Sequence, residues 1–295
     1  MTDRMNGKTN SLYSLLGGII VVLTAIALLG LIALGIVTSM TPEAPAIPQD
    51  DITSSASDLP VTSAAETTTA IMPESEPEQP STPVMLAQTA DMGQAYQDSI
   101  IFVGDSTTAH LRARGVLTGG TATQQVWVPS DNTLLLDFNI TKKKIVYPAT
   151  GIEMTIAEAA AKEKPAYMIL TIGLNGITSF VNDKNLYQNC YGKLIDAIKE
   201  ASPETRIILQ SVYPVAANQK SFSVDAKTLN GYIDILNGYV KELAAAKEIR
   251  YLDTNSALKG SDGLLPESYQ NGDGIHLTAE GYRVILDYIR THGYQ

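Results

Sequence analysis

Short apolar runs alternate with amphipathic segments along residues 97–295, and this alternation constrains the fold more than any other feature of the chain. The runs are rich in Ile, Val, Leu and Tyr, whereas the segments between them carry apolar residues at helical spacing. The expected strands are Ser99–Val103, Lys144–Tyr147, Ala166–Ile172, Arg206–Ser211 and Ile249–Leu252. Strands that alternate with helices form parallel units, so the sequence predicts an α/β domain whose mostly parallel, five-stranded sheet is covered on both faces.

Local signals also predict individual helices within this domain. Thr155 and Glu158 form a capping-box pattern that opens one helix, and Ala279–Ile289 has the apolar spacing of the last helix. Val116–Ile140 shows no regular pattern, so we expect a loop there, with a short hairpin around Gln125–Val128.

A long segment near the N-terminus carries no charged side chain, and its apolar run exceeds the roughly 20 residues that cross a bilayer. Arg4 and Lys8 precede this run and acidic residues follow it, which predicts that the C-terminus lies outside the cell. We therefore expect a single-pass membrane protein with a cytoplasmic N-terminus at residues 1–10 and an uncleaved transmembrane signal anchor at residues 11–40. A cleaved secretion signal is the alternative, because residues 44–46 resemble a cleavage site.

Residues 41–95 combine Pro, Ser, Thr and Ala with nine acidic side chains. No Lys or Arg occurs between Lys8 and Arg112, so most of the formal net charge of −10 falls on this segment. Such a composition buries too little apolar surface to offset chain entropy, and we expect a disordered linker. The remaining domain, residues 96–295, is close to neutral and has no basic stripe, which argues against a nucleic-acid partner.

Four clusters of small or polar residues follow the expected strands or precede the last helix. They are Gly104-Asp105-Ser106 after the first strand, Gly151 after the second, Gly173–Gly176 with Asn175 after the third, and the loop with Asp273 and His276. Ligands of open α/β sheets bind beyond the carboxyl ends of the strands, so we expect the clusters to meet there. Each cluster alone also has an ordinary structural explanation, such as a turn or a helix cap.

Together the clusters fit nucleophilic catalysis by a serine. A hydroxyl is a poor nucleophile until an imidazole accepts its proton, and an acceptor must hold that imidazole in one tautomer. We expect Ser106 to be the nucleophile, His276 the base and Asp273 the acceptor. The expected oxyanion donors are the backbone N–H groups of Ser106 and Gly151 and the side-chain amide of Asn175. No metal-ligand cluster or phosphate-binding glycine loop stands out in the sequence, so we expect no metal and no cofactor.

These motifs resemble the SGNH or GDSL-type hydrolase family over about residues 97–295. "FVGDST" is similar to the first family block, which carries the nucleophile, "IGLNG" to the third and "DGIHLTAEGY" to the last. Gly151 in "YPATGIEM" resembles the second-block glycine, with Gly119 and Gly120 as alternatives. The resemblance implies a three-layer, flavodoxin-like α/β/α sandwich, metal-free ester hydrolysis and the catalytic roles given above. Gly176 departs from the family pattern, which usually has an acid after the asparagine.

The expected function is that of an extracytoplasmic serine esterase. It would remove small acyl groups such as O-acetyl from carbohydrate or cell-wall glycan through an acyl-enzyme on Ser106, with the catalytic domain at the cell surface. A glycan O-acyltransferase is one alternative, because both reactions share the acyl-enzyme. A tethered, non-catalytic glycan-binding domain is another, to which only Gly176 points. His110, four residues after Ser106, is expected to have a surface or packing role.

Overall fold

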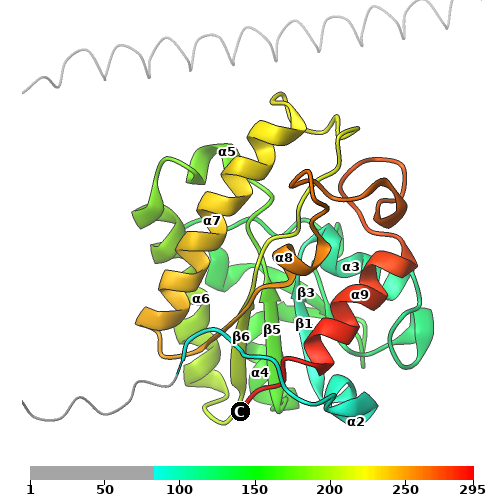
Figure 1. Cartoon of the computed structure of the whole chain (residues 1–295). Helices are drawn as coiled ribbons and strands as arrows, with labels where there is room; N and C mark the ends of the chain where they lie inside the picture. Colours follow the sequence, from blue (N-terminus) through cyan, green and yellow to red (C-terminus); the bar gives the residue numbers. More distant parts are fainter. Residues whose placement is uncertain (1–82) are drawn as a thin grey trace, which may run out of the picture. The chain divides into compact units, whose positions relative to one another are not determined.

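The computed structural model describes residues 83–295 (Figure 1). The expected cytoplasmic N-terminus, the membrane anchor and most of the linker lie outside the described residues, and they stay predictions. Within residues 83–295, no helix combines the length and the apolar character needed to cross a membrane.

The main sheet has five strands in the order β2-β1-β5-β6-β7, and every neighbouring pair in it is parallel. The strands are β1 (Ile100–Gly104), β2 (Val126–Trp127), β5 (Tyr167–Thr171), β6 (Arg206–Gln210) and β7 (Arg250–Leu252). This confirms the α/β class with a mostly parallel five-stranded sheet. The strand order reverses between β1 and β5, and in open sheets the carboxyl ends at such a point border the ligand site.

One expected strand does not belong to this sheet. Lys144–Tyr147 forms β3, which pairs antiparallel with β4 (Ile152–Thr155) in a separate two-stranded sheet. The fifth strand of the main sheet is β2, inside the segment that was expected to be a loop with a hairpin at Gln125–Val128. Both residues of β2 are buried, and two residues are too few to show the period-two pattern of a strand.

Helices cover both faces of the main sheet (Figure 1). One face carries α4 (Ile156–Glu163), α5 (Ile177–Phe180), α6 (Lys184–Ala201) and α7 (Ala226–Ala246), and the other carries α2 (Gly93–Asp98), α3 (Ser106–Ala113), α8 (Thr254–Leu258) and α9 (Ala279–Arg290). Short 3-10 turns lie at η1 (Gly120–Ala122), η2 (Ile140–Lys142) and η3 (Glu267–Tyr269). The expected capping box of Thr155 and Glu158 is present at the start of α4.

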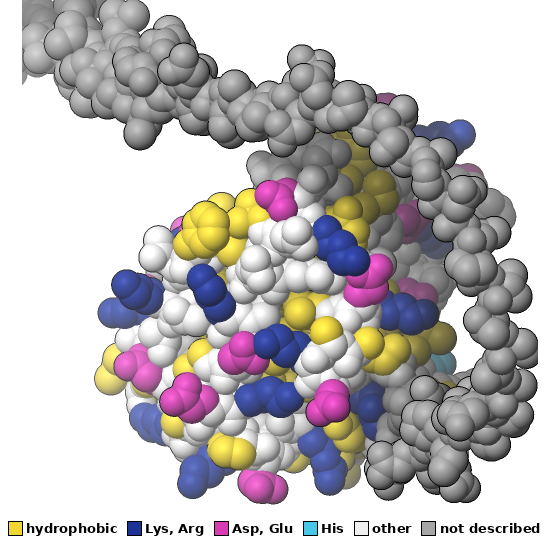
Figure 2. Space-filling model, turned by 90° about the vertical axis from the view of Figure 1, so that its left-hand side faces the viewer, with side chains coloured by type: hydrophobic (Ala, Val, Ile, Leu, Met, Phe, Trp, Pro, Cys, Tyr) yellow, Lys and Arg dark blue, Asp and Glu magenta, His cyan; other side chains and the backbone are white. Residues whose placement is uncertain are grey.

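Two apolar cores result from this arrangement, one on each face of the sheet. Successive side chains of a strand point to opposite faces. In β5, Met168 and Leu170 therefore join the core under α4, α6 and α7, whereas Ile169 joins the core under α2, α3 and α9. Figure 2 shows one face of the molecule, on which Lys and Arg side chains are interspersed with Asp and Glu.

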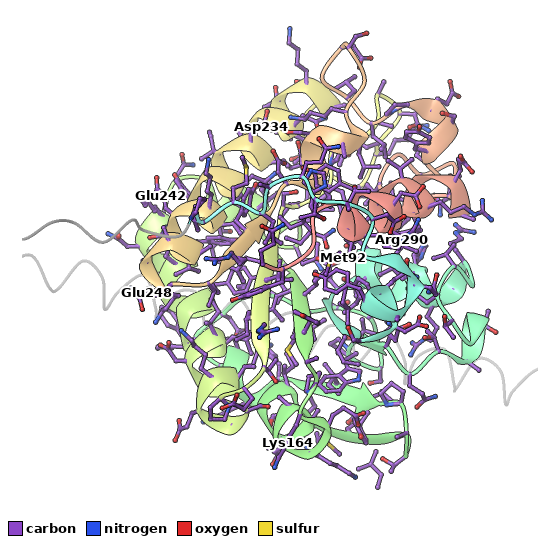
Figure 3. All side chains as sticks on the ribbon, turned by 60° about the horizontal axis from the view of Figure 1, so that its bottom comes forward. Met92, Lys164, Asp234, Glu242, Glu248 and Arg290 are labelled. Carbon is purple, nitrogen blue, oxygen red and sulfur yellow. The ribbon has the colours of Figure 1, made fainter. Side chains whose placement is uncertain are left out.

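The chain joins the domain before the expected boundary at residue 96. Leu86 N–H donates to the Tyr251 carbonyl and Tyr251 N–H donates to the Val84 carbonyl, both at 2.9 Å, so this segment runs beside β7. Further along, Met92 N–H donates to the Arg290 carbonyl at 2.9 Å, near the end of α9 (Figure 3). These backbone bonds make the last part of the expected linker a structural element of the domain.

Candidate active site

Ser106 is the first residue of α3 and follows β1 after a tight turn. Asp105 caps the helix, since its Oδ1 accepts the Thr107 backbone N–H at 2.9 Å. Gly104 leaves no space for a side chain, because a Cβ atom there would lie 2.1 Å from Thr108 Oγ1. The turn places the Ser106 hydroxyl at the carboxyl end of β1. The Ser106 N–H belongs to the first helical turn, where backbone donors have no carbonyl partner within the helix.

The structure brings Ser106, His276 and Asp273 together. His276 Nε2 lies 2.8 Å from Ser106 Oγ, and His276 Nδ1 lies 2.7 Å from Asp273 Oδ2, although 170 residues separate Ser106 from His276 in the sequence. A carboxylate oxygen can only accept a hydrogen bond, so Nδ1 carries the proton and Nε2 presents its lone pair to the hydroxyl. This is the arrangement in which an imidazole can remove the serine proton.

Asp273 organises the loop that carries His276. Its Oδ1 accepts the backbone N–H groups of Ile275 and His276 at 2.8 and 2.9 Å. Partial burial raises the pKa of Asp273, but the hydrogen bonds from the His276 ring and from the His276 and Ile275 N–H groups outweigh burial and leave this pKa below its usual value. The carboxyl group is therefore ionised at neutral pH and can stabilise an imidazolium beside it.

Asn175 reaches the same edge of the sheet from the loop after β5. Its Nδ2 donates to Asp105 Oδ2 at 3.2 Å, while Asp105 Oδ1 accepts the Thr107 N–H and hydroxyl. Asp105 is 2% exposed, and burial raises its pKa against the opposing effects of the Thr107 hydrogen bonds and of His276. An amide has two Nδ2 hydrogens, so the second can donate to a substrate oxygen. The carboxyl of Asp105 thus links the serine turn to the Asn175 loop, a role that its place in the Gly-Asp-Ser motif alone did not reveal.

Gly176 has a structural explanation in this loop. Its φ is +79°, a left-handed conformation that favours glycine, and a Cβ atom would lie 2.7 Å from Leu135 Cδ1. The backbone conformation and the packed Leu135 side chain therefore account for glycine where the family pattern usually has an acid.

Gly151 does not reach the site in the way the sequence predicted. It lies in the turn between β3 and β4 with φ +70°, and its N–H donates to the Tyr147 carbonyl at 2.8 Å. Because this hairpin is not part of the main sheet, Gly151 does not end a strand beside β1. Its N–H already has a partner, so we correct its assignment as an oxyanion donor.

The alternative glycines, Gly119 and Gly120, lie at the opposite edge of the sheet. The neighbouring Thr118 hydroxyl donates to Asp98 Oδ1 at 2.7 Å, and Asp98 ends α2 just before the amino end of β1. The loop that continues from the carboxyl end of β2 is residues 128–135, so Gly119 and Gly120 do not belong to it. Of the expected oxyanion donors, the Ser106 N–H and the Asn175 amide lie at the site edge of the sheet.

Residues 102–284 match the sequence model of the GDSL-like lipase/acylhydrolase family. The chain belongs to this family. It is accordingly a hydrolase that acts on ester bonds, as the four motifs predicted. No curated protein sequence matches this acylhydrolase.

Solved structures similar to this acylhydrolase include a GDSL-like lipase from Bacteroides thetaiotaomicron, at 16% identity over 66% of this chain and 87% of that one, with a TM-score of 0.46. The periplasmic domain of a lipopolysaccharide acetyltransferase from Salmonella Paratyphi A is 17% identical over 70% of this chain and 84% of that one (TM-score 0.41). An acetylxylan esterase from Geobacillus stearothermophilus is 18% identical over 72% of this chain and 98% of that one (TM-score 0.38).

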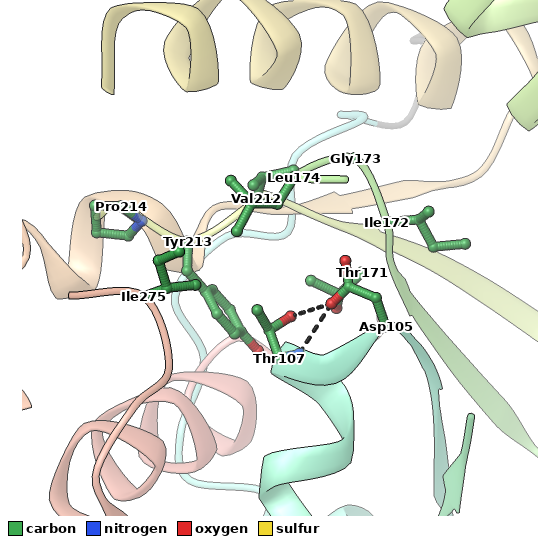
Figure 4. Close-up of a pocket in the computed structure, with 10 residues that line it drawn as sticks. All are labelled: Asp105, Thr107, Thr171, Ile172, Gly173, Leu174, Val212, Tyr213, Pro214 and Ile275. Carbon is green, nitrogen blue, oxygen red and sulfur yellow. Dashed lines mark hydrogen bonds between the residues drawn. The ribbon is translucent and has the colours of Figure 1, made fainter. Parts of the chain in front are cut away.

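A small cavity lies at the carboxyl ends of β1, β5 and β6 of the acylhydrolase (Figure 4). Its volume is about 10 Å³, which is space for one water-sized group. The lining residues are Asp105, Thr107, Thr171, Ile172, Gly173, Leu174, Val212, Tyr213, Pro214 and Ile275. The cavity meets the site at Asp105, whose carboxyl group accepts the Asn175 amide, while Ser106, Asn175, Asp273 and His276 themselves do not line it.

His110 also belongs to this neighbourhood, although the sequence predicted only a surface or packing role. Its ring stacks on that of His276, with centroids 4.2 Å apart and planes inclined by 24°. Burial lowers the pKa of His110 to about 4, the charges of His276 and Arg114 act in the same direction, and Asp273 opposes them. His110 is therefore neutral at pH 7. Its spacing of four residues from Ser106 was the only sequence signal for this contact.

Replacing His110 with Phe is expected to change how the stability of the acylhydrolase depends on pH. The pKa of His110 is about 4 in the folded chain and about 6.5 in an unfolded one, so between these values the unfolded chain binds more protons. The wild type should therefore lose stability over this range as pH falls, and His110→Phe should lose less. Urea unfolding of both proteins at about pH 7 and about pH 4.5 measures this difference.

Titrating groups that do not interact with His110 are common to both proteins and cancel in that comparison. A free-energy difference between the two proteins that stays the same at both pH values would contradict the burial of a neutral His110.

Proposed function

We propose that the chain is an extracytoplasmic serine esterase that removes small acyl groups such as O-acetyl from carbohydrate or cell-wall glycan. The observation that carries this proposal is the contact of 2.8 Å between Ser106 Oγ and His276 Nε2, with Asp273 Oδ2 at 2.7 Å from the other ring nitrogen. In the proposed roles Ser106 is the nucleophile, His276 the general base and Asp273 the residue that holds the base in its working tautomer.

The proposed reaction has two steps. Ser106 Oγ attacks the ester carbonyl while His276 Nε2 takes its proton, and the Ser106 N–H and Asn175 Nδ2 donate to the oxyanion of the tetrahedral intermediate. The intermediate collapses when His276 returns the proton to the leaving sugar oxygen, which leaves an acyl-enzyme. A water molecule then gives its proton to His276 and attacks the acyl carbon, and the proton returns to Ser106 as the carboxylic acid leaves.

The cavity beside the site supports a small acyl group. Its volume of about 10 Å³ is space for one water-sized group, which is close in size to a methyl group. Val212 and Leu174 supply apolar side chains to its wall, and Gly173 lies between the ends of Tyr187 and Val212, where a Cβ atom would be 2.8 Å from the Tyr187 hydroxyl. These close contacts limit how far the wall can open.

The proposed location outside the cell rests on the apolar segment at residues 11–40, which follows Arg4 and Lys8 and precedes acidic residues. Where the chain enters the domain bears on how a substrate reaches Ser106. Residues 84–92 run beside β7 and the end of α9 and lead through α2 to the amino end of β1. Ser106 lies at the carboxyl end of β1, at the other edge of the sheet. A chain tethered through its N-terminus would therefore present Ser106 on the side away from its point of attachment, where a glycan can reach it.

A series of p-nitrophenyl esters tests the acyl-group preference. We expect the full-length protein in detergent to hydrolyse the acetate at least about tenfold faster than the octanoate, measured as kcat/KM, because each methylene that does not fit costs binding energy in the transition state. Val212→Ala widens the cavity wall and should reduce this preference. Equal rates for all chain lengths in the wild type would contradict an acyl site limited to small groups.

Acetylated oligosaccharides then test the glycan substrate and separate hydrolysis from transfer. The esterase proposal predicts release of free acetate, with the Ser106→Ala protein as the blank. A second oligosaccharide is then added as acceptor. If more acetylated sugar than free acetate forms, the protein is instead a glycan O-acyltransferase.

A further inference from the structure

His110 makes a contact with the base that the two-step reaction does not require. The ring nitrogens of an imidazole donate and accept in the plane of the ring, so the hydrogen bonds of His276 to Ser106 and Asp273 resist tilting of the ring only weakly. The His110 ring lies face to face with His276, at 4.2 Å between centroids. It therefore restrains the one motion that the in-plane hydrogen bonds leave free.

The helix α3 carries both Ser106 and His110. Residues four apart on a helix lie on the same face, one above the other. The nucleophile and the ring that packs on the base are thus held by one rigid element, which keeps their spacing constant when the loop around His276 moves.

The surroundings of His110 favour a neutral ring. Its Nδ1 atom is buried and has no hydrogen-bond partner within residues 83–295. Arg114, which caps the C-terminus of α3, and His276 on the facing loop both oppose a positive charge on His110. The carboxylate of Asp273 on that loop favours such a charge. A neutral aromatic face attracts a cation, whereas a second positive charge repels it. A neutral His110 can therefore remain stacked when His276 becomes an imidazolium.

We propose that His110 is a positioning residue, which as a neutral stacked ring holds His276 in plane between Ser106 and Asp273 and tolerates the positive charge that His276 gains during turnover. This inference rests on the proposed roles of Ser106 and His276. It assigns to His110 no proton transfer and no contact with substrate.

Three replacements separate the aromatic face from the volume and the charge of His110. Phe keeps a flat neutral ring, Leu fills a similar volume without a ring, and Lys places a cation next to His276. We expect His110→Phe to lower kcat less than about threefold and His110→Leu to lower it about tenfold at unchanged KM, because a misplaced base slows the chemical step. His110→Lys should also lower kcat and move the acid limb of the kcat/KM profile to lower pH, since a nearby cation disfavours the imidazolium.

Histidine NMR gives a readout that does not depend on turnover. The chain has 3 histidines, so labelling the imidazole carbons yields three ring signals, and His292→Gln helps to assign them. In the full-length protein, His110→Phe should keep the ring-current shift of the His276 signal, and His110→Leu should remove it. The titration midpoint of His276 should fall in His110→Lys.

The two proposals fail in different ways. An unchanged His276 signal and an unchanged kcat in His110→Leu would overturn the positioning role, even if the esterase is active. Wild-type turnover by Ser106→Ala would instead overturn the catalytic proposal, while the NMR comparison of the Phe, Leu and Lys proteins would still report on the stack. If the Leu protein does not fold, the Phe and Lys pair decides, because equal His276 midpoints in these two proteins also overturn the inference.

Discussion

Ser106→Ala is expected to abolish ester hydrolysis, with a fall in kcat of about 10⁴- to 10⁶-fold. The replacement removes the oxygen that forms the acyl-enzyme and leaves the imidazole of His276 with no hydroxyl to activate. Asp105 still caps α3 through the Thr107 N–H, so the turn should keep its shape. The measurement is hydrolysis of p-nitrophenyl acetate, together with labelling by a serine-directed phosphonate.

Ser256 offers a matched control for this experiment. Like Ser106 it lies in the first turn of a helix that follows a strand and an aspartate cap, here Asp253 before α8, to which its hydroxyl donates at 2.7 Å. Ser256→Ala should keep wild-type turnover and wild-type labelling. Comparable activity of the Ser106→Ala and wild-type proteins would exclude Ser106 as the nucleophile.

Asp273→Asn is expected to lower kcat by about 10⁴-fold with little change in structure. Asp273 Oδ1 accepts the N–H groups of Ile275 and His276, and only an oxygen can do so. These two bonds orient the new amide so that its nitrogen faces His276 Nδ1. An N–H donor at that position forces Nδ1 to accept, so the proton moves to Nε2, and the atom next to Ser106 can no longer take the hydroxyl proton.

Asp262 provides the control for the amide replacement. Its Oδ1 accepts the Leu264 N–H at 3.0 Å in a similar two-residue turn, with no histidine bonded to it. Asp262→Asn should therefore leave kcat unchanged. Unfolding by urea should show both variants close to wild-type stability, and a fall in kcat of less than about tenfold in Asp273→Asn would contradict the orienting role.

The elements with strong local signals could be predicted because their causes lie within a few residues. The capping box of Thr155 and Glu158 and the apolar stripe of α9 depend on neighbours along the chain. Asp105-Ser106 and Asp273-x-x-His276 are likewise local turns whose caps and hydrogen bonds involve adjacent residues. The predicted class of fold and the predicted family therefore agree with the structure.

Local signals could not predict which distant segments pair with each other. Lys144–Tyr147 has the pattern of a strand whichever segment it pairs with. Its sequence therefore does not show whether it belongs to the β3-β4 hairpin or to the main sheet. Val126–Trp127 is too short to be recognised, and it becomes a strand because its backbone groups pair with β1. The assignment of Gly151 failed for this reason, since it assumed that β3 was the neighbour of β1.

By itself, the sequence determined the alternation of strands and helices, the family and the identity of Ser106, Asn175, Asp273 and His276 as the polar residues near strand ends. Only the tertiary structure decided that Asp105 bonds to Asn175 and that His110 stacks on His276. The physical reason is that a helix period or a turn depends on neighbouring residues, whereas side-chain contacts across the sheet edge exist only after packing has brought distant loops together.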